Sequence, residues 1–493
     1  MKLKIKFLKW SAGIPVVMLN NKTAENLGVY SKDRVILKTI SKPVKWISTI
    51  VDTIGKIIAE NEVVVSSELK EKLNLKEGQS VEIVLSSMPN SLTFIKKKLN
   101  NKRLSQEEID LIIHDINNNA LSEAEIALFV STMYDKGMDF KETIFLIKAI
   151  LKTGKTLKLK EKFIVDKHSI GGIPGNRTTP LVVSICASAG LIFPKTSSRA
   201  ITTSAGTSDV VEVLAPVEFS INKIKEIIKK TNACMVWGEG LGMVPADSKI
   251  IVIEKALRID PESQLLASIM SKKLAVGSNY ILIDIPYGKN AKVDLSQALK
   301  LKQKFKKIGK YFKKKLEVVL TKGDQPIGNG IGPVLEMIDV LKILDPKQHG
   351  PKDLEKKSIF LAGKLLEMTG KAKKGQGVKK AEEILRTGKA FEKFKEIIKA
   401  QGGFIKKLEP GKFKHNVLAK KTGKVLEINN KTINLLSRIA GCPTDKSAGI
   451  YLYVHKNYKI KKNEKILTIY SESESRLSEA VKFYAQNKII IIK

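Results

Sequence analysis

The sequence predicts a multidomain α/β protein, with a β-rich N-terminal extension, a helical domain, a central mostly parallel α/β domain and a C-terminal α+β domain. Three observations predict this class. The chain has 493 residues, which is more than one hydrophobic core usually organises. Its middle alternates short apolar runs with helical segments, while both ends carry strands of period-two alternation. The expected domains are 1–87, 88–160 completed by about 247–277, 161–246 together with 278–415, and 416–493.

The N-terminal extension contains an internal repeat. Leu3–Phe7 alternates Lys with apolar residues and predicts the first strand. Asp33–Leu37 and Gln79–Ile83 are alternating strands, and each follows a short helix and a turn. Two such copies are typical of a pseudo-twofold barrel, so we expect a barrel-like extension with a structural role.

Capping patterns identify the helical domain. Ser105 with Glu108 and Ser122 with Glu125 form the S-x-x-E pattern that opens a helix, and apolar residues follow each pair at helical spacing. A third helix is expected over Lys141–Lys152.

The central domain is predicted by strands that alternate with helices. Phe163–Asp166, Ile192–Phe193, Tyr280–Asp284 and Glu317–Leu320 are short apolar runs, and loops and helices separate them. This order favours a parallel sheet with the functional site at the carboxyl ends of its strands. Beyond it, Gly449–Val454 alternates with period two and indicates a final α+β domain.

Composition limits the function classes. Lys and Arg together number 87 against 50 Asp and Glu, and the formal charge is +37. A nucleic-acid partner is the obvious reading of such a charge. Arg is scarce, however, and aromatic residues rarely interleave with the basic runs, so the stacking platforms of a single-strand binder are missing. We therefore expect no specific nucleic acid, whereas attraction of small anions fits the charge.

The cysteine spacing and the lengths of the apolar runs allow further predictions. Cys186, Cys234 and Cys442 lie far apart and form no C-x-x-C pair, so neither a zinc site nor a disulfide framework is expected. No apolar run reaches the roughly 20 residues that a membrane helix requires. These features predict no metal, no membrane and a cytoplasmic protein.

The first candidate site segment is Asp166–Asn176. It follows a predicted strand, contains Gly171, Gly172 and Gly175, and precedes a helix expected over Thr178–Ala189. Glycines let a ligand approach the backbone, and amide groups at a helix start attract anions. With Lys167 as a charge and Ser169 as a donor, the segment predicts a phosphate site. An ordinary βα connection is the alternative.

The second segment is Lys195–Asp209, which also follows a strand. Ser and Thr residues crowd around Arg199 in it. A solvated Ser/Thr loop is one interpretation. A phosphate site is the other, because an Arg fork with short hydroxyl donors is what a phosphate needs.

The third segment is Arg258–Lys273. Asp260–Pro261 has the form of an N-cap followed by Pro at the first helical position. Ser268 and Lys272 are four residues apart and share a helix face. From the residues alone, Asp260 fits a cap better than a catalyst.

At these segments the sequence resembles the nucleoside phosphorylase family that contains the thymidine and pyrimidine-nucleoside phosphorylases, and within it the archaeal AMP phosphorylase branch. The resemblance extends over nearly the whole chain, and the N-terminal extension resembles that of the archaeal branch. The motifs that carry it are Pro89–Leu92, Asp166–Ser169, Ser198–Thr202, Ile259–Pro261, Ser268–Lys273, Gln325–Pro333 and Ala440–Lys446.

The resemblance implies phosphorolysis of nucleoside 5′-monophosphates (AMP, CMP or UMP) to a free base and ribose 1,5-bisphosphate, in nucleotide salvage or degradation. It implies Asp260 as the proton donor, no cofactor, inorganic phosphate as co-substrate, and a homodimer or larger oligomer. The implied phosphate ligands are Lys167, Ser169, Ser198 and Thr207. The implied nucleotide-binding residues are Gly172, Ser198, Arg199, Ala200, Ile201, Thr202, Thr203, Thr207, Ser268 and Lys292.

Further expectations follow from this resemblance and from the reaction. An acid can protonate the leaving base near neutral pH only if its pKa is raised, so the role of Asp260 as the acid is a hypothesis. Arg199 with its hydroxyl neighbours is expected to hold the 5′-phosphate of the substrate. Lys272 matches a base-side lysine, and His168 either touches the ligand or braces the loop. The site is expected between the helical and α/β domains, with domain closure.

Two departures separate the chain from the pyrimidine enzymes. Ile173–Asn176 replaces their usual Val-Gly-Asp, and Ile253 stands where they carry a base-binding Arg. Both favour the nucleotide branch. The alternatives are a thymidine or pyrimidine-nucleoside phosphorylase and, more distantly, an inactive basic nucleic-acid-binding protein.

Overall fold

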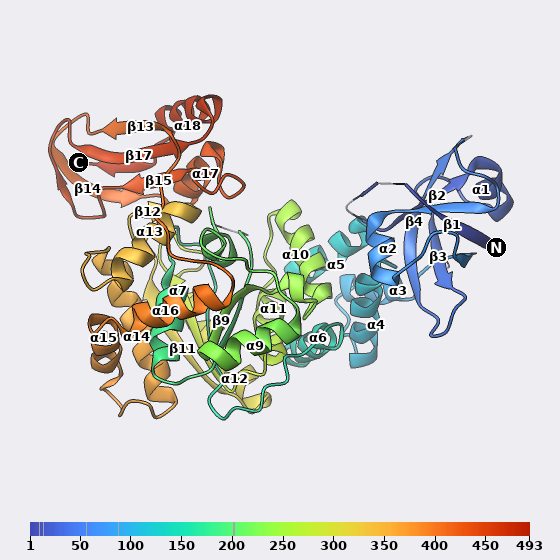
Figure 1. The fold of residues 1–493 in the computed structure, drawn as a ribbon, viewed down its shortest axis with the longest axis horizontal. Coiled ribbons are helices and arrows are strands. Elements are labelled where there is room, and N and C mark those ends of the chain that lie inside the picture. The colour runs from blue at the N-terminus through green and yellow to red at the C-terminus, as the bar shows by residue number, and fades with distance from the viewer. Residues whose placement is uncertain (9, 13, 56, 87, 201–202) are drawn as a thin grey trace. The chain divides into compact units, whose positions relative to one another are not determined.

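A computed structural model describes residues 1–493 except residues 9, 13, 56, 87, 201 and 202 (Figure 1). Contacts within the chain divide it into two compact units. Unit 1 comprises Met1–Gly154 and Val244–Ser271, and unit 2 comprises Lys155–Met243 and Lys272–Lys493. Among the described residues, no helix is long and apolar enough to cross a membrane.

Unit 1 begins with a closed barrel, which confirms the predicted barrel-like extension. The strands, blue in Figure 1, are ordered β1-β5-β2-β4-β3-β6, and fully buried residues such as Val17, Leu37 and Val81 fill the interior. Closure leaves no exposed strand edge. Its elements are β1 (Lys2–Phe7), β2 (Val16–Asn20), α1 (Asn21–Leu27), β3 (Arg34–Thr39), β4 (Trp46–Ile54), β5 (Glu62–Val65), α2 (Ser67–Leu73) and β6 (Ser80–Leu85).

Helices form the rest of unit 1. The Ser105–Glu108 and Ser122–Glu125 capping boxes are present, as predicted, and Asp139–Glu142 forms a third. Glu142 also pairs with buried Lys98 at 2.8 Å, so one carboxylate ties two helices together. The helices are α3 (Ser91–Leu99), α4 (Gln106–Asn117), α5 (Glu123–Lys136), α6 (Phe140–Lys152) and α10 (Pro245–Leu257), with α11 (Glu262–Ala275) running on into unit 2.

Unit 2 is built on parallel strands, as predicted for the central domain. β11 (Lys315–Lys322), β10 (Tyr280–Tyr287) and β7 (Val165–Ser169) pair in parallel, as do β8 (Phe193–Ser197) and β9 (Ala233–Trp237). A parallel bridge between Ile164 and Ile192 joins the two groups. The strand order is therefore β11-β10-β7-β8-β9, and the strand ends share one edge.

Helix α7 (Thr178–Ser188) is the centre of the unit 2 core. Its residues from Thr178 to Ala187 are all buried, because α14, α15 and α16 pack against it, as Figure 1 shows. The helices of this region are α8 (Thr207–Val211), α9 (Ile221–Thr231), η1 (Glu239–Leu241), α12 (Leu295–Tyr311), α13 (Pro333–Leu344), α14 (Lys352–Met368), α15 (Gly377–Arg386) and α16 (Lys389–Ala400).

The C-terminal region of unit 2 combines antiparallel strands with two helices, which confirms the α+β prediction. One sheet has the order β12-β15-β17-β13 and the other β16-β14-β18. Strand β12 comes from the central segment, so the two regions share a sheet. The elements are β12 (Gly330–Ile331), β13 (Phe413–Leu418), β14 (Gly423–Ile428), α17 (Asn430–Ala440), β15 (Gly449–Leu452), β16 (Lys459–Ile460), β17 (Lys465–Ser471), α18 (Glu474–Gln486) and β18 (Ile490–Ile492).

Candidate active site

Lys167 lies within strand β7. The sequence analysis had expected the strand to end at Asp166, with Lys167 in the segment that follows it. The strand continues to Ser169, because Asp166–Ser169 pairs with Ile281–Asp284 of β10. The side chain of Lys167 is buried, and its Nζ donates to Thr178 Oγ1 at 2.7 Å. Thr178 is the first residue of α7, so the ammonium group lies at the end of the helix that attracts anions.

Cations surround Lys167. Burial lowers the pKa of Lys167 to about 7, Asp284 opposes this effect, and Lys357, Lys195 and Arg177 add to it. Asp166, Asp284 and Glu336 pair with the neighbouring cations. Lys167, Lys195, Lys273, Lys357 and Arg177 still outnumber these carboxylates, which leaves a local excess of positive charge. A bound anion would relieve that excess and favour the protonated form of Lys167.

Asp166 holds two lysines that the sequence analysis assigned no role. Lys195 donates to Asp166 Oδ1 at 3.1 Å, and Lys273 donates to Oδ2 at 2.7 Å. All three side chains are buried, and Lys195 also donates to the carbonyl of Lys167 at 2.8 Å. Asp166 therefore connects strand β7, which carries Lys167, to the neighbouring strand β8 and to the end of helix α11.

The glycine turn after β7 brings two predicted nucleotide-binding positions together. Gly172 has φ +90°, and a Cβ there would lie 3.2 Å from the Cβ of Lys292. At Gly175, with φ +69°, a Cβ would lie 2.1 Å from the carbonyl oxygen of Ile327. Only glycine permits both the backbone conformation and the close packing. The turn thus lies against Lys292 and against the Gln325–Pro333 motif.

His168 contributes no charge to the site. Burial, with Lys273, Lys195, Lys272 and Lys167 nearby, holds the pKa of His168 well below its usual value. The ring is therefore neutral near pH 7, and it can exchange hydrogen bonds without attracting phosphate electrostatically.

In the second candidate segment, Lys195–Asp209, the loop begins later than expected, because β8 extends to Ser197. Ser198, Ala200 and Thr203 lie beyond the strand end. Ala200 N donates to Asp209 Oδ2 at 2.7 Å, and Gly206 N donates to the same oxygen at 2.7 Å. One carboxylate therefore folds the segment back on itself. The predicted nucleotide-binding residues Ile201 and Thr202 lie outside the described residues.

Arg199, the predicted 5′-phosphate ligand, is engaged by carboxylates. Its guanidinium donates to both carboxylate oxygens of Glu212, at 2.7 and 2.9 Å, and to Glu218 at 3.0 Å. It also lies 4.8 Å from the centre of the Trp237 ring. Hydrogen bonding from Arg199 lowers the pKa of Glu212 to about 2. Arg199 is therefore held by carboxylates in this structure, and its contact with the 5′-phosphate stays a prediction.

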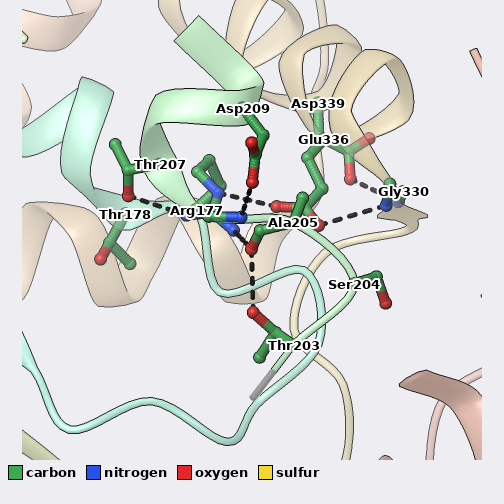
Figure 2. Close-up of polar contacts among 12 residues, drawn as sticks. Arg177, Thr178, Thr203, Ser204, Ala205, Thr207, Asp209, Gly330, Glu336 and Asp339 are labelled. Atoms are coloured by element: carbon green, nitrogen blue, oxygen red, sulfur yellow. Dashed lines mark hydrogen bonds and ion pairs between the residues drawn. The ribbon is translucent and has the colours of Figure 1, made fainter. Parts of the chain in front are cut away.

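Arg177, which the sequence analysis did not single out, organises the predicted phosphate ligand Thr207 (Figure 2). From the start of α7, its Nη1 donates to Thr207 Oγ1 at 2.8 Å and its Nη2 to the carbonyl of Ala205 at 2.7 Å. Its Nε donates to Glu336 of α13 at 2.7 Å, and both side chains are buried. Arg177 thus connects three segments that are distant in the sequence.

A buried carboxyl group holds the Gln325–Pro333 motif. Asp339 Oδ2 accepts from the backbone amides of Asn329 and Gly330, each at 2.7 Å. Burial raises the pKa of Asp339 to about 6, although the two amides oppose that shift. In Figure 2, Asp339 and Glu336 project from α13 towards this turn.

Asp260 and Ser268 belong to unit 1. Helix α11 begins at Glu262, and the carbonyl of Pro261 accepts from the amide of Leu265. Pro261, and not Asp260, therefore occupies the position where the helix starts, one residue later than predicted. Ser268 donates to Asp247 Oδ2 at 3.0 Å, so its hydroxyl is held by a buried carboxylate of α10.

All four predicted phosphate-binding residues lie in unit 2. Lys167 and Ser169 are at the end of β7, Ser198 directly follows β8, and Thr207 begins α8, whose next residue Ser208 donates to the carbonyl of Ser198. Asn176 Nδ2 donates to Ser169 Oγ at 3.4 Å, which adds a contact within the turn. Among the described residues, no group of three or more His, Cys, Asp or Glu side chains forms a metal site.

Three known domains match the chain, and two of them belong to one family. Residues 92–154 match the helical bundle domain of the glycosyl transferase family, and residues 161–391 match its a/b domain. Residues 424–491 match the pyrimidine nucleoside phosphorylase C-terminal domain.

Individual proteins match over nearly the full length. An AMP phosphorylase of Methanococcus aeolicus is 42% identical over 485 residues, which cover 98% of this chain and 95% of the relative. One of Pyrococcus horikoshii is 44% identical over 487 residues, covering 98% and 96%. The anthranilate phosphoribosyltransferase of Thermus thermophilus shares the fold, with a TM-score of 0.52 and 16% identity over 63% of this chain and 99% of that chain. The chain belongs to the AMP phosphorylase family.

Proposed function

We propose that the protein catalyses the reversible phosphorolysis of nucleoside 5′-monophosphates, with AMP as the first substrate and CMP and UMP as further ones. The observation that carries the proposal is the buried ammonium of Lys167 at the start of α7, with an excess of cations around it. That arrangement suits an inorganic phosphate. The AMP phosphorylases that the chain resembles over 98% of its length supply the substrate class.

In the proposed reaction, a phosphate oxygen attacks C1′ of the ribose and forms the new C1′–O bond. The C1′–N bond breaks, and its electron pair stays with the leaving base. Asp260 gives its proton to a ring nitrogen of that base, and the products are the free base and ribose 1,5-bisphosphate. Lys167, Ser169, Ser198 and Thr207 hold the attacking phosphate, which keeps it positioned and stabilises its charge.

The nucleotide-binding role is assigned to Gly172, to residues 198–203 and Thr207, and to Ser268 and Lys292. The close packing of Gly172 against Lys292 supports a shared role for these two positions. Because Arg199 is engaged by Glu212 and Glu218, the backbone and hydroxyl groups of its segment are the better donors for the 5′-phosphate. Lys272 is assigned to the base side.

The same proposal includes a cytoplasmic homodimer or larger homo-oligomer that needs no cofactor. The reaction itself supports the last point: phosphate is the nucleophile, a carboxyl group is the acid, and no electron is gained or lost.

One assay tests the function. The purified protein is incubated with AMP, CMP, UMP, adenosine or thymidine, with and without inorganic phosphate, and the liberated base is measured. We expect base release only with phosphate, and faster release from AMP than from adenosine. Release from thymidine with no preference for a 5′-phosphate would indicate a pyrimidine-nucleoside phosphorylase instead. No phosphate-dependent release from any substrate would refute the proposal.

A further inference from the structure

A cavity of about 570 Å³ lies at the end of β11 in unit 2. Three separate segments line it: the end of β11 with the turn that follows, one face of α14, and the turn after β15. The α14 residues are spaced so that they project from one side of the helix. They are Asp353, Lys356, Lys357 and Phe360. None of the predicted phosphate- or nucleotide-binding residues lines this cavity.

Positive charge dominates the lining. Besides Lys357, it contains Lys322, Lys356 and Lys456. The charge of Lys456 also acts on Glu427, whose pKa it helps to lower after the larger effects of Lys289 and Asn290. The lining also contains Asp324 and Asp353, but backbone amides already engage both.

Asp353 Oδ1 accepts from the amides of Gly328 at 3.3 Å and Leu354 at 2.8 Å. Asp324 Oδ1 accepts from the amide of Lys289 at 3.2 Å. These bonds orient the two carboxylates towards the backbone. Four ammonium groups from three segments therefore converge on one hollow. Two carboxylates share the lining and Asp284 pairs with Lys357, so a net positive charge remains.

Lys357 links the cavity to the strands that carry the phosphate site. Its side chain is only 7% exposed, and its Nζ lies 3.0 Å from Asp284 Oδ2. Asp284 also accepts from Thr321 Oγ1 at 2.6 Å and lies opposite Ser169 in the sheet. The carboxylate that balances Lys167 is thus the one that Lys357 holds.

We propose that this cavity is a second binding site, separate from the phosphorolysis site, for a phosphorylated small molecule with at least two negative charges. The lysines hold the phosphate groups, and Phe360 offers an aromatic surface for an organic portion. The volume suits a nucleotide-sized ligand. A bound anion competes with Asp284 for Lys357, so its occupancy changes the affinity of the neighbouring site for inorganic phosphate.

Calorimetric titration of the full chain tests the proposal. The probes are inorganic pyrophosphate, for a purely inorganic ligand, and ADP, for an organic one. Saturating inorganic phosphate is present throughout, so that the phosphate position of the phosphorolysis site is occupied. The test variant is K322Q/K456Q, in which both altered residues are exposed, and the matched control is K306Q/K307Q, which removes two exposed charges from α12.

We expect pyrophosphate to bind the unaltered chain at one site, and K322Q/K456Q to weaken it by about tenfold or more, since each phosphate contact to a lysine is charge-assisted. K306Q/K307Q should change the dissociation constant by less than about twofold, as expected for a distant surface charge. If ADP is the better ligand, Phe360→Ala should weaken the binding of ADP and leave the binding of pyrophosphate unchanged.

No binding to the unaltered chain, or an equal loss in both double variants, would overturn the site. ADP that binds K322Q/K456Q with unchanged affinity and stoichiometry would count against the second site as well, since that ADP occupies the nucleotide position of the phosphorolysis site. Base release from AMP is measured separately in every variant. Failure of the proposed function is therefore read from base release, and failure of the second site from the titration.

Discussion

The guanidinium of Arg177 donates a 2.8 Å hydrogen bond to the hydroxyl of Thr207. One residue precedes α7 and the other begins α8, so this bond fixes the spacing between two helix starts at the edge of the sheet. Glu336 holds the same guanidinium from α13. The predicted phosphate ligand Thr207 thus depends on a buried ion pair for its position.

This dependence predicts separate effects on the free energy of unfolding and on the KM for phosphate. Arg177→Met leaves Glu336 buried without its partner, and the free energy of unfolding should fall by about 3–5 kcal/mol. Arg177→Met combined with Glu336→Gln should recover much of that stability but should keep a raised KM for phosphate, because Thr207 is still unsupported. Denaturant unfolding and initial rates measure the two quantities. A normal phosphate KM in the double variant would show that Arg177 does not position the ligand.

Replacing Lys167 should weaken phosphate binding. The Lys167→Met side chain keeps a similar length without the ammonium group, and the loss of a charged hydrogen bond costs about 1.5–3 kcal/mol. The KM for phosphate should rise by about 10- to 100-fold, whereas the KM for AMP should change little. Lys306→Met, on the exposed face of α12, is the control. Equal effects on both substrates would contradict the assignment of Lys167 to phosphate.

The pKa of Lys167 also predicts a dependence of phosphate binding on pH. With the pKa at about 7 in the free protein, Lys167 is largely neutral at pH 8, and phosphate favours its charged form. Binding at pH 8 should therefore take up part of a proton at Lys167. Calorimetry in buffers of different ionisation enthalpy measures this uptake. The difference between the unaltered chain and Lys167→Met isolates the contribution of Lys167 from that of phosphate itself, and no difference would contradict the prediction.

Stability without phosphate should rise with pH. The pKa of Lys167 is about 7 in the folded chain against an ordinary value of 10.5, so between these values the unfolded chain binds more protons. The free energy of unfolding should then increase from pH 7 upwards, with Lys167 contributing about 1.4 kcal/mol per pH unit at most. In Lys167→Met this slope should be lower by the amount that corresponds to about one bound proton. Urea unfolding at pH 7, 8 and 9 checks it, and an unchanged slope would count against a neutral Lys167.

Asp260→Asn tests the acid. The amide keeps the shape of the carboxyl group but cannot release a proton to the base, so kcat should fall by about 10²- to 10⁴-fold. The KM for AMP should stay within about threefold, because general-acid help is realised in the transition state. Glu262→Gln is the matched control on the same segment. Retained turnover in Asp260→Asn would exclude Asp260 as the proton donor.

Local patterns predicted much of the fold. The S-x-x-E caps at Ser105 and Ser122 opened helices where expected, because capping depends on residues that are close in the sequence. Strand ends were less accurate. β7 and β8 continue through Lys167 and Lys195, polar residues that ended the apolar pattern. Their ammonium groups are accommodated because Thr178 and Asp166, from other segments, receive them.

The residues that organise the site were harder to recognise than those assigned to the ligand. Arg177 lies between the glycine turn and α7, and its partners Thr207 and Glu336 are distant in the chain, so no spacing connects them. Arg199, by contrast, was prominent because hydroxyl residues surround it. Its actual partners, Glu212 and Glu218, come from later turns that fold back on it.

The sequence by itself determined the order of domains, the caps and the glycine turn, since each depends on local chemistry, whereas the phosphate-binding side chains stay a prediction from the family resemblance. Only the tertiary structure decided the electrostatics. Which carboxylates neutralise Arg199, which cations crowd Lys167, and which lysines converge around Phe360 all depend on segments brought together by packing. A buried charge takes its energy from its neighbours in space, and the chain order does not reveal those neighbours.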